Sequence, residues 1–258
     1  MHSPDISELL EQLQDIVPHL NVTRLTLLNR MAVALQNDVD TSRNSTSDFA
    51  TPRFLEYFSS RLLIHHSVVE EKLNKKSFEY VFRDALRHDG KTADLTVDET
   101  YPGADIVVDG VRISLKTEAS KRIKKEEITI SKFMEARWIR GQNSSGLAKL
   151  SSEHLGQHMK GYERVLILRA FTVEASNVQY DLLEIPHSLL MLASSLQASE
   201  INLSSGKSGG GRALIQSQDQ DAFTVRFDGS VEKVTIAKLR SNLCTSHASW
   251  TVPLTVNQ

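Results

Sequence analysis

The pair Asp109-Gly110 is the feature of this sequence that most constrains its fold, because it separates two short runs rich in β-branched residues. A two-residue Asp-Gly connection between such runs favours a type I′ turn, which joins two antiparallel strands. The sequence therefore predicts a β-hairpin whose register is set by the turn. The predicted pairs across this hairpin are Val108–Val111, Val107–Arg112, Ile106–Ile113 and Asp105–Ser114.

The register divides the hairpin into an apolar face and a polar face, because successive side chains of a strand point to opposite sides. The apolar face carries Ile106, Val108, Val111, Ile113 and Leu115, and the polar face carries Asp105, Arg112, Ser114, Lys116 and Glu118, with Val107 among them. Opposite or diagonal residues lie about 4.5 to 8 Å apart, so the Asp105 carboxylate and the Lys116 ammonium can serve one small ligand, such as a metal-bound phosphate. An ordinary solvated strand face would show the same residue types.

Positive charge is concentrated in and just after the hairpin. Residues 111–140 contain nine Lys or Arg and four Glu, a net charge of +5, whereas the whole chain of 258 residues has a formal net charge of -2. The chain therefore has no overall positive field, and binding to nucleic acid has to come from a local patch. This segment makes a phosphate backbone a plausible partner, and a charged surface without a ligand is the alternative.

Composition excludes several other classes of protein. With 40% hydrophobic residues the chain can build a core, so a disordered chain is not expected. The single cysteine, Cys244, cannot form an internal disulfide or a cysteine zinc site. No apolar run approaches the roughly 20 residues that span a membrane, and the first residues lack a signal-peptide pattern. We therefore expect a cytoplasmic protein without a membrane partner.

The order of the expected elements predicts a mixed α/β fold, with a mixed β-sheet flanked by helices. We expect a single domain over residues 1–258, in which 1–66 form an N-terminal helical layer and 67–258 form the core. Residues 37–47 read as a loop. Helices are predicted near 54–64, 67–87, 132–140, 147–160 and 188–197, the second of them capped by Ser67. Strands are predicted at 164–173, 178–185, 223–227 and 231–236, the last two joined at Asp228-Gly229.

The hairpin residues resemble the metal site of the PD-(D/E)xK nucleases. The short motif is Pro102-Gly103-Ala104-Asp105 followed by Ser114-Leu115-Lys116. A longer similarity to type II restriction endonucleases covers about residues 60–252. It is carried by Leu63-Ile64-His65-His66, Phe78-Glu79, Ser114 to Ala119, Ser131 to Glu135, Tyr162-Glu163-Arg164, Leu183 to Pro186, Ser188-Leu189-Leu190 and Phe227-Asp228-Gly229.

The resemblance implies a restriction-endonuclease-like core and Mg²⁺-dependent cleavage of both strands of a short palindromic DNA site. It further implies a homodimer, a cognate DNA methyltransferase acting on the same site, a six-base G·C sequence such as CCCGGG, and product ends with a 5′-phosphate. Two alternatives remain open at this point. A repair nuclease that nicks one strand would keep the same hairpin, and a DNA-binding protein without catalysis could use the same scaffold.

The resemblance assigns roles to the hairpin residues. Asp105 and the backbone carbonyl of Leu115 would bind Mg²⁺, which prefers oxygen ligands, and Lys116 would act on the attacking water. The family usually has an acid two residues before the lysine, but Ser114 stands there. We expect Glu79 to supply the second carboxylate; Glu118 is the next candidate, followed by Glu135 and Glu99.

Basic residues beyond the hairpin are candidates for contact with DNA. Phosphate contacts are expected from Lys121, Arg122, Lys124, Lys125 and Lys132. Arginine pairs well with guanine in the major groove, so Arg137, Arg140, Arg169 and Arg212 are candidate readers of the sequence. The adjacent His65 and His66 are interpreted as packing and capping residues of a helix end.

Overall fold

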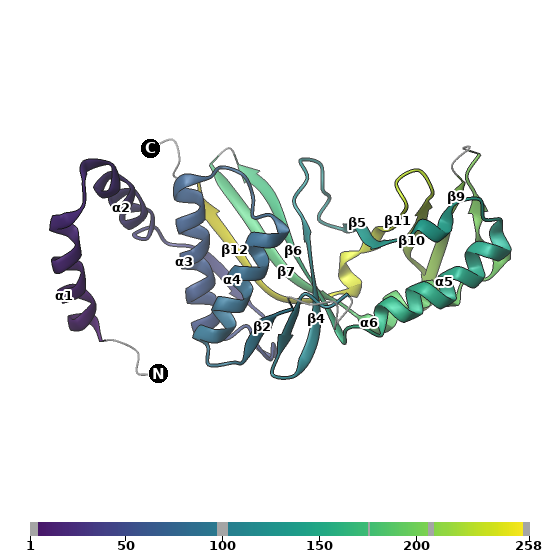
Figure 1. The fold of residues 1–258 in the computed structure, drawn as a ribbon, viewed down its shortest axis with the longest axis horizontal. Coiled ribbons are helices and arrows are strands. Elements are labelled where there is room, and N and C mark those ends of the chain that lie inside the picture. The colour runs from purple at the N-terminus through teal and green to yellow at the C-terminus, as the bar shows by residue number, and fades with distance from the viewer. Residues whose placement is uncertain (1–4, 97–102, 175, 206–208, 255–258) are drawn as a thin grey trace.

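A computed structural model describes residues 5–96, 103–174, 176–205 and 209–254. Two β-sheets lie side by side along the longest axis of the molecule, with helices packed on both (Figure 1). This arrangement confirms the predicted fold class, a mixed α/β fold with helices flanking the sheets. None of the described helices is both long enough and apolar enough to cross a membrane.

The N-terminal part is helical, as predicted. Its elements are α1 (Ile6–Ile16), the 3₁₀ turn η1 (Val17–His19), α2 (Val22–Ala34), α3 (Pro52–Val68) and α4 (Lys75–His88). Helices α3 and α4 pack on the first sheet, and α2 contacts α3. Helix α1 lies at the end of the molecule, away from the sheet (Figure 1). The first sheet is therefore covered on this side by two amphipathic helices, whose buried residues include Phe58 and Phe82.

The first sheet has seven strands in the order β1-β12-β7-β6-β4-β3-β2. Their bounds are β1 (Asp40–Arg43), β2 (Ala93–Leu95), β3 (Ile106–Val108), β4 (Val111–Glu118), β6 (Arg164–Glu174), β7 (Asn177–Ile185) and β12 (Thr245–Pro253). Strands β4 and β6 are parallel, and the other pairs are antiparallel.

The second sheet has five antiparallel strands in the order β5-β11-β10-β9-β8. Their bounds are β5 (Glu127–Glu135), β8 (Asn202–Leu203), β9 (Gly210–Ser217), β10 (Gln220–Asp228) and β11 (Lys233–Arg240). Helix α5 (Ser144–Met159) packs near this sheet with α6 (His187–Met191) and the 3₁₀ turns η2 (Arg137–Ile139), η3 (Leu192–Ser195) and η4 (Ala198–Glu200); a further turn, η5 (Ser241–Leu243), precedes β12.

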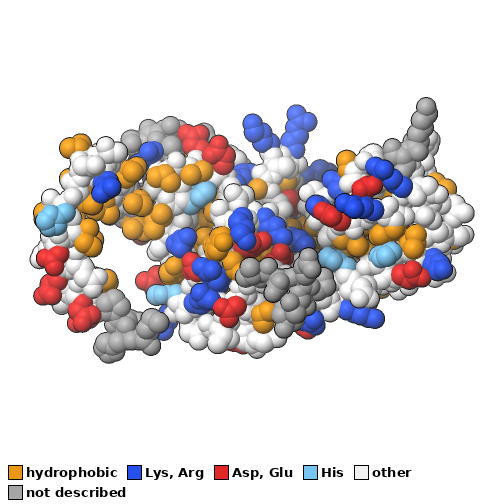
Figure 2. Space-filling model, in the orientation of Figure 1, with side chains coloured by type: hydrophobic (Ala, Val, Ile, Leu, Met, Phe, Trp, Pro, Cys, Tyr) orange, Lys and Arg blue, Asp and Glu red, His pale blue; other side chains and the backbone are white. Residues whose placement is uncertain are grey.

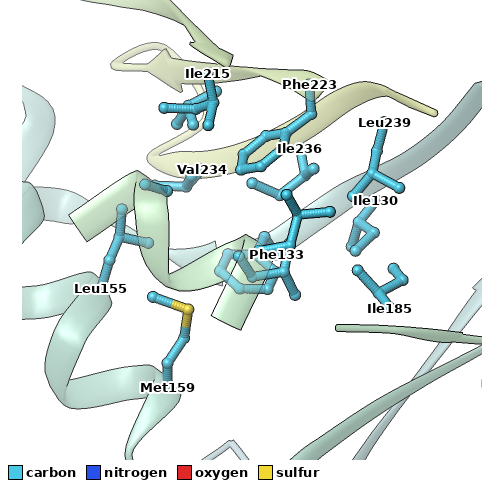
Figure 3. Packing of buried hydrophobic residues seen from close by; sticks show 14 of the residues in the cluster. Ile130, Phe133, Leu155, Met159, Ile185, Ile215, Phe223, Val234, Ile236 and Leu239 are labelled. Carbon is cyan, nitrogen blue, oxygen red and sulfur yellow. The ribbon is translucent and has the colours of Figure 1, made fainter. Parts of the chain in front are cut away.

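Two hydrophobic cores lie on opposite faces of the first sheet. On β6, Leu166 and Leu168 belong to the core under α3 and α4, whereas Val165 and Ile167 belong to the core shared with the second sheet and α5. The second core is shown in Figure 3, where Phe133 of β5 lies among side chains of α5 and of the second sheet. Strand β6, which pairs with β4 of the hairpin, is thus buried from both sides, as expected for a strand at the centre of a layered α/β fold.

The hairpin forms with the predicted register. Val108 pairs with Val111, Val107 with Arg112 and Ile106 with Ile113. Both turn residues have positive φ, 48° at Asp109 and 85° at Gly110, as a type I′ turn requires.

Three predictions about local structure are wrong. Residues 132–140 are not a helix, because β5 runs to Glu135 and only a 3₁₀ turn follows it. Ser67 does not begin a helix: it lies within α3, and α4 begins at Lys75 behind the cap of Asn74, whose side chain accepts the Ser77 N–H. The predicted loop 37–47 contains strand β1, which pairs along β12 at the sheet edge.

A network of charged side chains joins the ends of three neighbouring strands of the first sheet, β6, β7 and β12. Glu184 of β7 accepts hydrogen bonds from Arg164 of β6 at 3.0 Å and interacts with His247 of β12 at 2.9 Å. Arg164 also contacts Asp48, and His247 contacts Ser47, so the segment before α3 is held by the same network. Burial raises the pKa of Glu184, but the hydrogen bonds and charges of His247 and Arg164 outweigh burial and hold that pKa at about 2.

We expect Glu184→Gln to lower the free energy of unfolding at pH 7 by up to about 3 kcal/mol. The pKa of Glu184 is depressed on folding, so its contribution is fully present above the unfolded value of 4.5 and is lost as the pH falls from 4.5 toward 2. Urea unfolding at pH 7 and pH 3 measures this. The exposed Glu153 provides the control Glu153→Gln, and a difference between wild type and Glu184→Gln that is the same at both pH values would contradict the assignment.

Candidate active site

Asp105 is held at the start of the hairpin by contacts with strand β4 and helix α4. Its backbone N–H donates to the Ile113 carbonyl at 2.9 Å. Its carboxylate Oδ2 accepts the backbone N–H of Leu115 at 2.6 Å and the hydroxyl of Ser114 at 3.2 Å. The other oxygen, Oδ1, accepts a hydrogen bond from the ammonium of Lys75 at 2.6 Å. The carboxylate is therefore fixed in orientation by three donors from two different elements.

Ser114 occupies the position where the resembling family usually carries an acid, and it is fully buried. Its hydroxyl can donate a hydrogen bond to Asp105 but cannot add a negative charge. The structure thus gives Ser114 a positioning role for Asp105, and a second carboxylate has to come from another element.

Glu79 of α4 lies across the Lys75 ammonium from Asp105. Lys75 Nζ is 3.6 Å from Glu79 Oε1 and 2.6 Å from Asp105 Oδ1, and Lys76 Nζ is 3.0 Å from Glu79 Oε2. The Glu79 residue is only 8% exposed, so its carboxylate faces the hairpin rather than the solvent. The structure therefore brings together Asp105 and Glu79, the two acids expected to hold a cation. Glu135 does not join this pair, because it forms an ion pair with the exposed Lys132 on β5. Glu99 lies outside the described residues.

Lys116 follows on the polar face of β4, with its side chain half-buried. Burial lowers the pKa of Lys116 to about 8; Lys75 contributes in the same direction, while Asp105 and Glu79 oppose it. No hydrogen bond or ion pair joins the Lys116 ammonium to another described residue. The ammonium is thus close to losing its proton at neutral to mildly basic pH and is free to act on a ligand.

A cleft of about 430 Å³ opens beside Lys116, between the two sheets. It is lined by Lys75 of α4, Lys116 and Thr117 of β4, and Ile130, Ser131, Lys132, Phe133 and Met134 of β5. Three lysines on one cleft produce a positive potential, which suits a phosphate group.

The described donors fit a magnesium ion better than a softer metal. The N–H of Leu115 points to Asp105, and the carbonyl of a strand residue points to the same edge as its N–H, so the Leu115 carbonyl faces this side as well. Two carboxylates and a carbonyl are oxygen donors, and Mg²⁺ is usually held by one or two carboxylates with several waters. Within the described ranges, no group of three or more His, Cys, Asp or Glu side chains forms a denser metal site.

Glu118, the second candidate acid, is engaged elsewhere. It is buried and receives a hydrogen bond from Arg169 of β6 at 2.7 Å and from the Thr129 N–H at 2.8 Å. Burial raises the pKa of Glu118, and the charge and hydrogen bond of Arg169 oppose that effect. The structure does not bring Glu118 to the ammonium that Asp105 and Glu79 share.

Arg169 is a structural residue, so the prediction that it reads guanine is wrong. It is 1% exposed, and besides Glu118 it donates to the backbone carbonyls of Lys124, Lys125 and Glu127. These contacts fix the base of the loop between β4 and β5 against the first sheet.

The other predicted DNA contacts lie on the surface. Lys121, Arg122, Lys124 and Lys125 are exposed on the loop that joins β4 to β5, and Lys132 is exposed on β5. Figure 2 shows Lys and Arg side chains projecting from the middle of the molecule, between the two sheets. Arg137 and Arg140 are exposed beyond β5 and both pair with Glu232.

Sequence reasoning missed three residues near the site. Lys75 lies in the first turn of α4, which the sequence placed in mid-helix. His158 and Tyr162 flank Gly103, and the buried His158 Nε2 and Tyr162 hydroxyl have no hydrogen-bond partner among the described residues. Burial lowers the pKa of His158 to about 4, and Lys116 adds to this effect. The sequence offers a signal for Lys75, because Asn74 is a typical helix cap and two lysines follow it. It offers none for His158 or Tyr162.

The fold and this site define a nuclease: a carboxylate pair and a free lysine at the end of a hairpin, beside a basic cleft. Residues 13–252 match the SmaI family, described as type II site-specific deoxyribonuclease, and the chain belongs to this family. Type II restriction enzyme SmaI of Serratia marcescens is 34% identical over 220 residues, which cover 83% of this chain and 85% of that protein. No solved structure matches the chain.

We expect Arg169→Met to lower the free energy of unfolding by about 3 to 5 kcal/mol, because it leaves the buried Glu118 carboxylate without its positively charged partner. Replacing both members, as in Glu118→Leu with Arg169→Met, should recover part of this loss. Denaturant unfolding measures both effects, with the exposed Arg212→Met as control. An Arg169→Met protein as stable as wild type that cuts at altered sequences would instead support a reading role.

Proposed function

We propose that this chain hydrolyses both strands of duplex DNA at a short palindromic site in a reaction that requires Mg²⁺ and leaves 5′-phosphates. The observation that carries this proposal is the placement of Lys116, unpaired among the described residues, next to a fixed Asp105 and inside a basic cleft. The similarity to SmaI family enzymes favours a G·C-rich site resembling CCCGGG.

Asp105, Glu79 and the Leu115 carbonyl would hold the magnesium ion. When bound, the ion supplies a lowered pKa for its water and neutralises charge that develops on the phosphate. Ser114 and the Leu115 N–H keep the Asp105 carboxylate oriented toward the ion site. Glu118 serves the reaction indirectly, since its pair with Arg169 anchors the strand that carries Lys116.

Lys116 is the residue that acts on the attacking water. Its lowered pKa of about 8 makes the amine available to orient the water and accept its proton, and the protonated form then stabilises charge on the phosphate. The water oxygen bonds to phosphorus as the bond to the 3′-oxygen breaks, so the phosphate stays on the 5′ end. The half-buried position of Lys116 strengthens its interaction with the phosphate.

The basic loop between β4 and β5 would position the duplex. Lys121, Arg122, Lys124 and Lys125 contact phosphates in this proposal, with Lys132 inside the cleft. Arg137, Arg140 and the exposed Arg212 of β9 are the remaining candidate readers of bases.

The chain acts as one nuclease unit over residues 1–258, with the cleavage and recognition elements in 67–258. One site per chain and a palindromic target require two chains related by a two-fold axis for cleavage of both strands. A cognate methyltransferase protects the same site in the host, and both proteins work in the cytoplasm.

Two other functions remain as test outcomes. A nicking repair nuclease would use the same Asp105 and Lys116 but open only one strand of a plasmid. A DNA-binding protein without catalysis would have no use for an unpaired, half-buried lysine beside two carboxylates, and the deoxyribonuclease family argues against it.

We expect wild-type protein to convert a plasmid into discrete linear fragments with Mg²⁺ and to leave it intact with EDTA. Sequencing of the fragment ends gives the site, the cut position and the end chemistry together. Asp105→Asn and Lys116→Met should each lower the cleavage rate about 100-fold or more, because each removes a group that stabilises the transition state.

Asp109→Asn is the matched control, since it makes the same change in the turn of the same hairpin and asparagine tolerates positive φ. An Asp105→Asn protein that cleaves like wild type would refute the assignment of Asp105. Nicked circles as the final product would favour the repair nuclease.

A further inference from the structure

The N-terminal arm, defined as Ile6–Ala34 with α1, η1 and α2, carries an apolar surface that nothing else in the described chain covers. None of the residues of α1 is buried, and Ile6, Leu9, Leu10, Leu13 and Ile16 are 45 to 77% exposed along one face of the helix. The space-filling view leaves an open gap between α1 and the rest of the molecule (Figure 2). An isolated 11-residue helix is marginal in water, so α1 needs a packing partner.

Helix α2 connects this surface to the body of the protein. Its half-buried residues face α3, whereas Val22, Leu27 and Val33 are exposed on its other sides. The arm therefore presents two helices with apolar faces to the solvent, far from the basic loop that we assign to DNA.

The charges of the arm are separated between its two helices. Helix α1 and its cap carry Asp5, Glu8, Glu11 and Asp15 and no basic residue. Helix α2 carries Arg24 and Arg30 and no acidic residue. An acidic helix repels a phosphate backbone, so DNA is a poor partner for α1, whereas the α2 of another copy is complementary to it.

We infer that the arm is the dimer interface, with α1 of one chain packing into the gap beside α2 of a second copy, and the reverse contact made at the same time. Such an exchange is self-complementary, as a two-fold interface requires. The arm spans about the 20 to 30 residues that a stable interface takes from each partner. This inference rests on the proposed homodimer and assigns a surface to it.

Sedimentation velocity of the full chain without DNA tests the arm. The double variant Leu10→Gln with Leu13→Gln keeps helix propensity but removes two leucines from each chain, four from the dimer interface. The dimer dissociation constant should therefore rise about 100-fold or more. Leu214→Gln is the matched control: Leu214 is as exposed as Leu13, at 47%, but lies on β9 of the second sheet.

The outcomes distinguish the assignment of the arm as the interface from the existence of a homodimer. Dimeric wild type and control with a monomeric double variant support the inference. A double variant that stays dimeric overturns the arm as the interface and leaves the homodimer intact. A monomeric wild type at all concentrations, or one that dimerises only on a DNA duplex, overturns the inference because the arm then does not join two free copies.

A second inference comes from the contacts of Lys75. This lysine lies in the first turn of α4, where the helix dipole disfavours a cation, and its ammonium bridges the carboxylates of Asp105 and Glu79. The same side chain lines the cleft with Lys116 and Lys132. A cation between two carboxylates relieves their mutual repulsion, and a metal ion at the same carboxylates would make it redundant.

We propose that Lys75 is a positioning residue that holds the two carboxylates together in the metal-free protein and turns toward a DNA phosphate in the cleft when Mg²⁺ binds. Lys75 and the metal then compete for the same oxygens. Lys76 provides a comparison on the same helix turn, since it pairs with Glu79 at 3.0 Å but is more exposed and makes no ion pair with Asp105.

Binding of Mn²⁺ to the full chain without DNA tests this competition, because Mn²⁺ takes the same oxygen ligands and its free form is measured by electron paramagnetic resonance. We expect Lys75→Met to bind Mn²⁺ about tenfold more tightly than wild type, a change of about 1.4 kcal/mol. Lys76→Met removes the same charge and should change the affinity much less, and Lys75→Gln repeats the test with a polar side chain.

Equal tightening in the Lys75 and Lys76 variants would mean a general charge effect and would overturn the competition. Unchanged or weaker binding in both Lys75 variants would overturn it as well, without touching the nuclease assignment. Wild-type protein that binds no Mn²⁺ yet cleaves DNA in EDTA would refute the metal role in the proposed function, and this inference with it.

Discussion

The hydrogen bond from the Leu115 N–H to the Asp105 carboxylate is the contact on which the site depends. It forms because the type I′ turn sets the hairpin register and places Asp105 opposite Ser114, one residue before Leu115. The same register directs Leu115 into the core under α3 and α4 and Lys116 toward the cleft. A slip of one residue would reverse both side chains, so the burial of Leu115 and the position of Lys116 depend on one turn.

The hairpin could be predicted from sequence because its signals are local. Asp109 and Gly110 lie between alternating runs, and the positions of Asp105 and Lys116 then follow from the register alone. Strand β5 could not be predicted in the same way. Ile128 and Ile130 alternate, but the pairing of β5 with β11 shifts register after Ile130, and Phe133 is buried out of step with them. This break leaves an apolar spacing that looks helical.

The second acid shows where sequence reasoning ends. Glu79 and Glu118 are both candidates from sequence, and contacts between distant parts of the chain distinguish them: Lys75 links Glu79 to Asp105, whereas Arg169 binds Glu118. Arg169 comes 51 residues after Glu118 and meets it only because β4 and β6 are parallel neighbours. Lys75 meets Asp105 only because α4 begins there and not at Ser67. Tertiary pairing of charges therefore separates two candidates that sequence reasoning can only rank.

The cleft lies where the chain leaves one sheet and enters the other. Strand β4, the second strand of the hairpin, belongs to the first sheet. The basic loop follows it, and β5 then begins the second sheet with Lys132 on the cleft wall. The buried Glu118–Arg169 pair holds the end of β4 and the base of this loop against β6. The Ser114 and Leu115 groups that orient Asp105 are thus part of the sheet, whereas the cationic residues that we propose for DNA contact lie on the connection. Substitution of an exposed loop side chain would then alter the proposed DNA contacts without disturbing the Asp105 geometry, because Arg169 holds the loop base through backbone carbonyls and the buried Glu118.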